Sequence, residues 1–192
     1  GRAPQGERLE RIKKSPHYKD GEFRNLHSTV MMTSQKGRLG AFWGFLFKKE
    51  TDLRPETEIP VIKTDLSKIS KDENVLVWFG HSSYFIQIDG KRILVDPVFC
   101  VASPVSFVNK PFKGADAYKP ADMPEIDYLV ISHDHWDPLD YETVMQLKNR
   151  VGKVVCPLGV GEHFEYWGFD KSSLVELDWC EDTVLDKGFL LH

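Results

Sequence analysis

Two histidines and an aspartate lie close together in the segment ISHDHWDPLD, which covers residues 131–140. His133 and His135 flank a single residue, so a turn at this point can aim both imidazole rings at one cation. Asp137 follows two residues later and can add a hard oxygen ligand. This set suits zinc, or a mixed pair of zinc, iron or manganese, with water in an open position. Such a water, with its pKa brought down to about 7, is a hydrolytic nucleophile.

The same residues have a second interpretation. Asp137 followed by Pro138 is a good helix start, with aspartate as the N-cap and proline at the first helical position. In that case the histidines are solvated turn residues. The spacing alone leaves both readings open and favours the metal site.

The segment before the histidines reads as a strand buried on both faces, from Ile126 to Ser132. Sites in α/β sheets are built where strands end, so the histidines would stand at such an edge. An antiparallel meander is predicted upstream, with a two-residue turn at Asp89-Gly90. Its strands are Val75–Phe79, Tyr84–Ile88 and Arg92–Val95. Residues 96–125 form a long connection, which is typically functional or packed over a site.

Helices and strands alternate after the histidines. Apolar residues at helical spacing predict a helix after Asp140, and a shorter helix ends before Gly168. The helical apolar positions are Tyr141, Val144, Leu147 and Val151, and the shorter helix covers His163–Trp167. Further strands are expected at Val154–Pro157 and Leu174–Leu177, followed by a hairpin over Thr183–Leu191. This order predicts an α/β layered protein.

The first 60 residues differ from the rest, so we expect an N-terminal segment over 1–60 and a domain over 61–192. Residues 1–38 are polar and predict an extended or partly helical arm that wraps a surface. The aromatic run LGAFWGFLF, Leu39–Phe47, lies between basic residues and could contact a membrane interface. The alternative, which we favour, is a short helix whose aromatic face closes part of the core or of a substrate groove.

Composition excludes several classes of protein. The chain has 192 residues and a formal charge of −4, with no basic stripe, so we expect no nucleic acid partner. No apolar stretch approaches the roughly 20 residues that span a bilayer. The chain begins with Gly1, so an upstream signal or anchor could have been removed, and the sequence leaves the compartment open. The candidates are a cytoplasmic and a membrane-peripheral location. Three scattered cysteines predict reduced thiols, with Cys156 acting as a small buried hydrophobe.

Several separated motifs appear in the order that one known family has. These are WFGHSSYFIQIDGKRILVDPVF, SPVSF, PEIDYLVISHDHWDPLD, and CPLGVGEHFEYWGF with ELDW. Together, over residues 60 to 192, they resemble the metallo-β-lactamase superfamily. The most similar branch contains N-acylphosphatidylethanolamine-hydrolysing phospholipase D and related bacterial metal-dependent hydrolases.

The resemblance implies an αββα sandwich with a metal site at one edge. The family motif HxHxDH maps onto His133, His135 and Asp137. The histidines would bind one metal, and the aspartate would bind the second and act in catalysis by helping to hold the bridging hydroxide. Pro138 stands where the family has a ligand histidine, and proline cannot ligate, so the second metal is in doubt.

Supporting residues follow from the same resemblance. Asp96 matches a family aspartate near the metal site, and His81 matches a histidine that is structural or supports the ligands. Asp140 is close enough in sequence to accept a ring N–H from a ligand histidine. For Asp96 the alternative is a turn residue before Pro97, and for His81 it is a satisfied core histidine, which we favour. His163 we take to be structural.

Family members continue past the hairpin at which this chain stops, so we expect the first half of the fold plus an arm. One hypothesis is a zinc-dependent hydrolase that cleaves a phosphodiester or ester in a small-molecule or lipid-like substrate. The alternative is a truncated or degenerate homologue that acts as a non-catalytic assembly or binding module. An exposed sheet edge would then favour a homo-oligomer that completes the fold.

Overall fold

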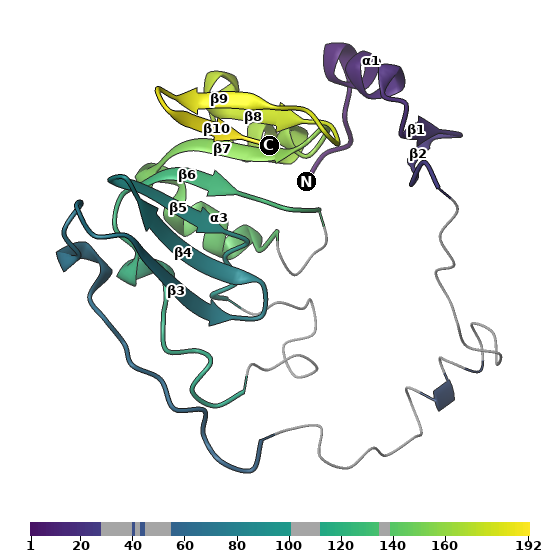
Figure 1. Ribbon diagram of the computed structural model, residues 1–192. Helices are drawn as coiled ribbons and strands as arrows, with labels where there is room; N and C mark the ends of the chain where they lie inside the picture. The colour runs from purple at the N-terminus through teal and green to yellow at the C-terminus, as the bar shows by residue number, and fades with distance from the viewer. Residues whose placement is uncertain (28–39, 41–42, 45–54, 101–111, 135–138) are drawn as a thin grey trace.

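The computed structural model describes residues 1–27, 40, 43–44, 55–100, 112–134 and 139–192 (Figure 1). Its centre is one six-stranded sheet in which the strands lie in the order of the sequence. The strands are β3 (Val75–Gly80), β4 (Ser83–Ile88), β5 (Lys91–Val95), β6 (Ile126–Val130), β7 (Val151–Pro157) and β8 (Leu174–Leu177). β3, β4 and β5 are antiparallel, whereas β5 to β8 are parallel.

The antiparallel half confirms the predicted meander. Ile88 pairs with Lys91, so Asp89 and Gly90 form the two-residue turn between β4 and β5. Both turn residues have positive φ, 48° and 73°, as such a turn requires when it matches the twist of the flanking strands. The sequence DG therefore fixes the register of this hairpin.

The parallel half is connected by helices. α3 (Tyr141–Leu147) joins β6 to β7, and α4 (Gly161–Tyr166) joins β7 to β8. The prediction that the first helix includes Val151 was wrong, because a 3-10 turn, η3 (Lys148–Arg150), follows α3 and Val151 begins β7. Val151 pairs with Ile126 of β6, so it belongs to the sheet, and its helical spacing from Leu147 is fortuitous. Two further 3-10 turns are η1 (Leu66–Lys68) and η2 (Pro120–Asp122), and η4 (Lys171–Ser173) precedes β8.

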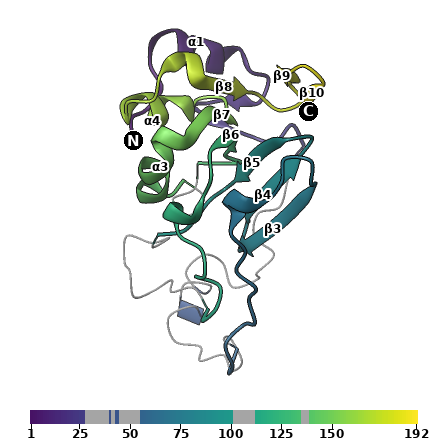
Figure 2. The same cartoon turned by 90° about the vertical axis from the view of Figure 1, so that its left-hand side faces the viewer.

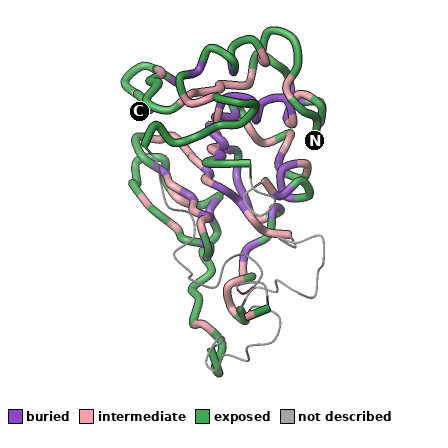
Figure 3. The backbone as a smooth tube through the Cα atoms, turned by 90° about the vertical axis from the view of Figure 1, so that its right-hand side faces the viewer, coloured by how far each residue is buried: buried purple, intermediate pink, exposed green. Residues whose placement is uncertain are grey.

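Two apolar cores lie on opposite faces of the sheet. Along β6, Leu129 belongs to the larger core with Val144 and Phe164 of the helices, whereas Tyr128 belongs to a smaller one. Successive strand residues point to opposite faces, so the helices cover one face and the small core covers the other. The hairpin of β9 (Thr183–Asp186) and β10 (Phe189–Leu191) closes that small core through Leu185. These layers of helix, sheet and hairpin confirm the predicted α/β class (Figure 2). The buried residues concentrate along the central strands (Figure 3).

The N-terminal segment begins with a helix, α1 (Gly6–Lys14), followed by a small hairpin of β1 (Tyr18–Lys19) and β2 (Glu22–Phe23). Ile12 of α1 is buried, and the helix lies beside α4 and β8 (Figure 2). Of the aromatic run at 39–47, only Gly40, Trp43 and Gly44 are described, so the predictions for this run fall outside the described residues. In the described part of the chain, no helix is both long and apolar enough to cross a membrane.

Candidate metal centre

The carboxyl ends of the central parallel strands meet at one edge of the sheet. Val95 of β5 pairs with Val130 of β6, and Val130 pairs with Val155 of β7. Asp96 therefore leaves β5 beside the point where Ser132 and His133 leave β6. This is the edge at which α/β sheets place their functional groups, and it is where the sequence predicts the metal ligands.

Asp96 organises this edge. Its side chain is buried and its φ is +41°, a left-handed conformation in the turn before Pro97. One carboxylate oxygen accepts the Ser132 backbone N–H at 2.8 Å, and the other accepts the Ser132 hydroxyl at 2.6 Å. The Asp96 side chain thus replaces a strand partner for Ser132, so β6 ends at Val130 and not at Ser132 as predicted. Asp96 does occupy a turn before Pro97, and its predicted place near a metal site stays a prediction, to which its bonds to the residue before His133 are relevant.

His133 is held by the same chain of hydrogen bonds. Its Nδ1 lies 2.7 Å from the Ser132 hydroxyl oxygen. That hydroxyl has one hydrogen, which points to the Asp96 carboxylate, so only its lone pairs face His133. Nδ1 must then carry the proton and donate it to Ser132. A neutral ring that donates from Nδ1 has its lone pair on Nε2, which is the form that a metal-ligating histidine requires.

The other predicted ligands, His135 and Asp137, lie outside the described residues, as does Pro138. Among the residues that are described, no group of three or more His, Cys, Asp and Glu side chains could hold a metal ion. What the structure shows of the predicted site is His133 with its Nδ1 directed at Ser132, and two further predicted donors follow it in the sequence. Two imidazoles and a carboxylate fit the nitrogen and oxygen preference of zinc or iron.

Asp140 caps a helix, and its predicted role as an acceptor for a ligand histidine stays a prediction because His135 lies outside the described residues. Asp140 is the N-cap of α3, where one oxygen accepts the backbone N–H groups of Glu142 and Thr143 at 3.1 and 3.2 Å. Its other oxygen accepts the Thr143 hydroxyl at 2.6 Å and the Cys100 N–H at 2.9 Å. Among the described residues, these bonds engage both oxygens. The carboxylate therefore fixes the start of α3 and ties it to residue 100.

His81 lies at the same edge but is not a core histidine. It is exposed and has a φ of +47°, in the turn between β3 and β4. Its carbonyl oxygen accepts the indole N–H of Trp78 at 3.0 Å. Two residues later, the buried Ser83 hydroxyl donates to the Asp96 carbonyl oxygen at 2.6 Å, so this turn packs against the Asp96 turn. The favoured prediction of a satisfied core position was wrong, because the turn places the ring in solvent.

A cavity of about 880 Å³ opens beside His133. Residues 132–134 after β6 line one side of it, and Leu158 and Val160, from the loop after β7, line another. Pro4 and Ile12 of the N-terminal segment also contribute to its wall. The cavity is therefore assembled from segments more than a hundred residues apart, which the sequence does not bring together.

His163 also lines this cavity, which its interpretation as a structural residue missed. Its Nδ1 accepts the Arg2 backbone N–H at 3.0 Å, and its ring stacks on Trp167 at a centroid distance of 6.0 Å. Burial lowers the pKa of His163, and nearby Asp134 opposes that shift. The lowered pKa favours the neutral ring, in a cavity that His133 and Asp134 also line. No local spacing could have identified it, because its partner Arg2 is 161 positions away.

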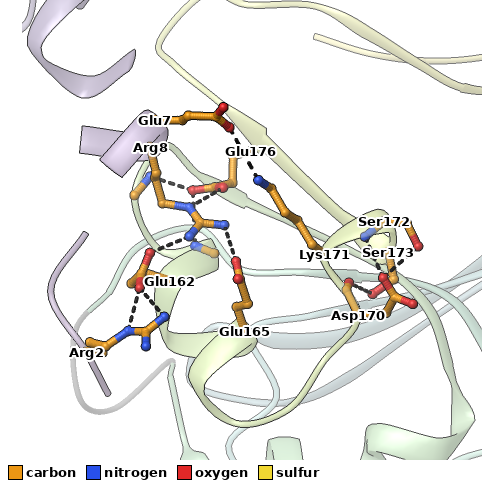
Figure 4. Close-up of polar contacts among 12 residues, drawn as sticks. Arg2, Glu7, Arg8, Glu162, Glu165, Asp170, Lys171, Ser172, Ser173 and Glu176 are labelled. Carbon is orange, nitrogen blue, oxygen red and sulfur yellow. Dashed lines mark hydrogen bonds and ion pairs between the residues drawn. The ribbon is translucent and has the colours of Figure 1, made fainter. Parts of the chain in front are cut away.

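Arg8 of α1 is the centre of a second polar cluster, which the sequence did not reveal (Figure 4). Its guanidinium donates to Glu176 of β8 at 2.7 Å, to Glu165 of α4 at 3.0 Å, and to Glu162 of α4. Arg2 adds a second cation, with its Nε 2.5 Å from Glu162. Arg8 and Glu162 are only 10% and 4% exposed, so these pairs are largely shielded from water. Burial by itself lowers the pKa of Arg8, but the hydrogen bonds to Glu176 and Glu162 raise it above its ordinary value.

A model of the Beta-lactamase superfamily domain matches residues 91–190, from β5 to β10. This chain belongs to that superfamily. The match includes the whole edge that carries Asp96, Ser132 and His133, and it confirms the family that the sequence motifs predict. The superfamily fold agrees with the layers observed here.

Individual relatives agree with this assignment. An uncharacterized protein of Mycobacterium tuberculosis is 35% identical over 175 residues, which is 90% of this chain and 47% of the relative. An N-acyl-phosphatidylethanolamine-hydrolyzing phospholipase D of Caenorhabditis elegans is 30% identical over 120 residues, 57% of this chain and 33% of that protein. A metal-dependent hydrolase of Caldivirga maquilingensis is 29% identical over 83 residues, 43% of this chain and 30% of that protein. The relatives of this superfamily member thus include metal-dependent hydrolases, and the chain spans at most about half the length of these three.

Proposed function

We propose that this chain carries the metal-binding edge of a metal-dependent hydrolase, with His133, His135 and Asp137 as ligands. The observation that carries the proposal is the hydrogen-bonded series from Asp96 through Ser132 to His133, which orients the His133 ring through its Nδ1 beside a cavity that His133 also lines. Supporting groups of this kind orient and strengthen ligand histidines. A structural turn histidine has no need of such a series.

The proposed substrate is a phosphodiester or ester. The nematode relative is named for hydrolysing a phosphatidylethanolamine, whose head group is joined by a phosphodiester. A bound metal ion supplies charge stabilisation and an activated water for this class of reaction. The chain's own groups hold the site: Ser132 fixes the ring of His133, and the Asp137 carboxylate adds an oxygen donor. The cavity beside His133 receives the substrate.

We also propose that zinc is the metal and that one ion is held firmly per chain. Pro138 stands where the superfamily motif has a second-site histidine, so the second position loses a nitrogen ligand. Proline has no side-chain donor that could replace it. Metal analysis after dialysis should find fewer than two zinc or iron ions per chain, and a His133→Ala/His135→Ala variant should retain almost none. Two firmly held ions per chain would contradict this stoichiometry.

The activity is tested on the zinc-loaded chain with bis(p-nitrophenyl) phosphate and p-nitrophenyl acetate. We expect turnover of at least one of them, and we expect His133→Ala to reduce it by about a hundredfold or more, since a ligand is lost. A matched control is His27→Ala, because His27 is exposed and does not line the cavity. Equal loss in both variants, or turnover that persists without metal, would count against the hydrolase. Metal binding without any turnover would favour the non-catalytic alternative.

A further inference from the structure

The loop that joins β7 to α4 is held from inside by one carboxylate. Glu176 Oε1 accepts the backbone N–H of Gly159 at 2.8 Å and that of Gly161 at 3.3 Å. Gly159 has a φ of +100°, which only glycine adopts readily. A Cβ atom at Gly161 would lie 2.5 Å from Glu176 Cδ, so the absence of a side chain makes room for the carboxylate. The two glycines thus bind the Glu176 carboxylate and leave room for it.

The other oxygen of Glu176 faces α1. Arg8 Nε donates to Oε2 at 2.7 Å, and the Glu176 side chain is only 11% exposed. A carboxylate with so little exposure is stable where it is if a cation compensates its charge. Without Arg8 it would gain free energy by turning toward water, and it would then leave the Gly159 and Gly161 amides. The loop geometry therefore depends on a residue 168 positions away in the sequence.

This loop is a wall of the cavity beside His133. Leu158 and Val160 flank Gly159, both are almost completely buried, and both line the cavity. α1 also makes an apolar contact with this loop. A Cβ atom at Gly159 would lie 3.0 Å from Ile12 Cδ1, so the Ile12 side chain packs directly on the glycine. Polar and apolar contacts of α1 therefore converge on one short segment that lines the same cavity as Ser132 and His133.

We propose that Arg8 is a positioning residue for the candidate metal site: through Glu176 it fixes residues 158–160, which line the same cavity as His133. The α1 helix is then part of the binding site and does more than cover a surface. The inference rests on the proposed function only in taking this cavity as the place where substrate binds. The dependence of the loop on Arg8 is a property of the chain itself and can be measured without turnover.

The test is amide hydrogen exchange, followed by NMR, on the full chain and two variants. Arg8→Gln removes the cation that faces the Glu176 carboxylate. Arg11→Gln is the matched control, because Arg11 lies on the same helix and bonds the Glu176 carbonyl oxygen at 2.9 Å, not its carboxylate. Exchange at Gly159 and Gly161 is compared with exchange at core amides such as Leu129 and Val154, which report the global stability.

In Arg8→Gln we expect exchange at the two glycine amides to accelerate by about tenfold or more beyond the acceleration seen at the core amides. In Arg11→Gln we expect the glycine and core amides to change together. If Arg8→Gln does not fold, Arg8→Lys serves instead. It keeps the charge but has no planar fork to bridge three carboxylates, so the same selective loss of protection is expected in smaller degree. The proposal would be overturned if, in the variant that folds, exchange at the two glycine amides accelerates no more than exchange at the core amides. It would also be overturned if exchange at the glycine amides accelerates by the same factor in the Arg11 control.

A kinetic measurement then connects the loop to binding. With bis(p-nitrophenyl) phosphate, Arg8→Gln should raise KM about fivefold or more with kcat nearly unchanged, because a displaced wall weakens binding without touching the reacting groups. A fall in kcat of about fivefold with KM unchanged would contradict the positioning role. A wild-type chain that shows no turnover would refute the proposed function, while the exchange result would still decide the dependence of the loop on Arg8.

Discussion

At the scale of single residues, the structure separates two aspartates that the sequence treats alike. Asp96 and Asp140 were both expected to support the metal ligands. Asp96 accepts hydrogen bonds from Ser132, the residue before His133, whereas the bonds of Asp140 in the described part of the chain fix the first turn of α3. The difference comes from the backbone. A left-handed turn aims Asp96 across to the end of β6, and the N-cap geometry aims Asp140 at its own helix.

The hydroxyl of Ser132 should therefore matter for metal affinity. Ser132→Ala breaks the link between Asp96 and His133, so the ring loses the acceptor that fixes its tautomer. We expect zinc affinity to fall by roughly tenfold, within the range known for such supporting groups, when measured by competition with a chelator. Ser172→Ala is the control, because Ser172 also donates to an aspartate, at 2.8 Å, but in an exposed turn. An affinity that is equal in both variants would show that Ser132 does not hold the ligand.

At the scale of elements, the ends of the helices are decided by contacts and not by apolar spacing. The apolar spacing of residues 141 to 151 fits one helix, yet α3 stops at Leu147 because Val151 is needed as the first residue of β7. The start of α3 is equally specific. The Asp140 side chain is buried and accepts hydrogen bonds from three backbone N–H groups and one hydroxyl.

Removing this cap should destabilise the whole chain. Asp140→Ala leaves those four donors without their acceptor in a buried place, and we expect a loss of about 2 kcal/mol or more in the free energy of unfolding. Urea denaturation measures it. Asp170→Ala is the comparison, because Asp170 caps the short turn η4 at an exposed position and should cost about 0.5 to 1 kcal/mol. A smaller loss for Asp140 than for Asp170 would contradict the structural role assigned to it.

At the scale of the whole molecule, one buried cluster joins the two ends of the chain. Arg2 and Arg8 bring α1 against Glu162, Glu165 and Glu176, which lie on α4 and β8. Exposed ion pairs contribute little, but a shielded pair becomes strongly unfavourable when one partner is lost. The docking of the N-terminal helix should consequently respond to pH.

Glu162 determines the direction of that response. Burial raises its pKa, but the hydrogen bonds from Arg8 and Arg2 outweigh burial, so its pKa lies below the ordinary value of 4.5. The folded state then binds this proton more weakly than the unfolded state does. The stabilisation is fully present above about pH 4.5 and is lost as the pH falls through the folded pKa.

Unfolding measured between pH 3 and pH 7 should show this loss in the wild-type chain. Glu162→Gln should be less stable at pH 7 by about 3 kcal/mol, because Arg8 and Arg2 lose a shielded partner, and its stability should fall less steeply on acidification. Glu10→Gln is the control, since Glu10 pairs with Lys13 in full exposure to solvent. A Glu162 variant that is as acid-sensitive as the wild type would show that other carboxylates govern the acid response.

Much of the framework was predictable because its signals are local. Alternating or continuous apolar residues identified all six strands of the main sheet, and Asp89-Gly90 identified the hairpin turn. The motif at residues 133–137 and the order of the other motifs predicted the superfamily that the comparison confirmed. The ligand set itself stays a prediction, because His135 and Asp137 lie outside the described residues.

The sequence by itself thus determined the positions of the strands, the class of fold and the position of the candidate ligands, since each depends on residues close together in the chain. Only the tertiary structure decided which nitrogen of His133 faces Ser132, which aspartate binds Ser132, and that α1 lines the cavity. These features depend on single hydrogen bonds between residues far apart, such as Asp96 with Ser132 and Arg8 with Glu176. A period of hydrophobic residues places a side chain on a face, but it does not specify the distant partner that the side chain meets there.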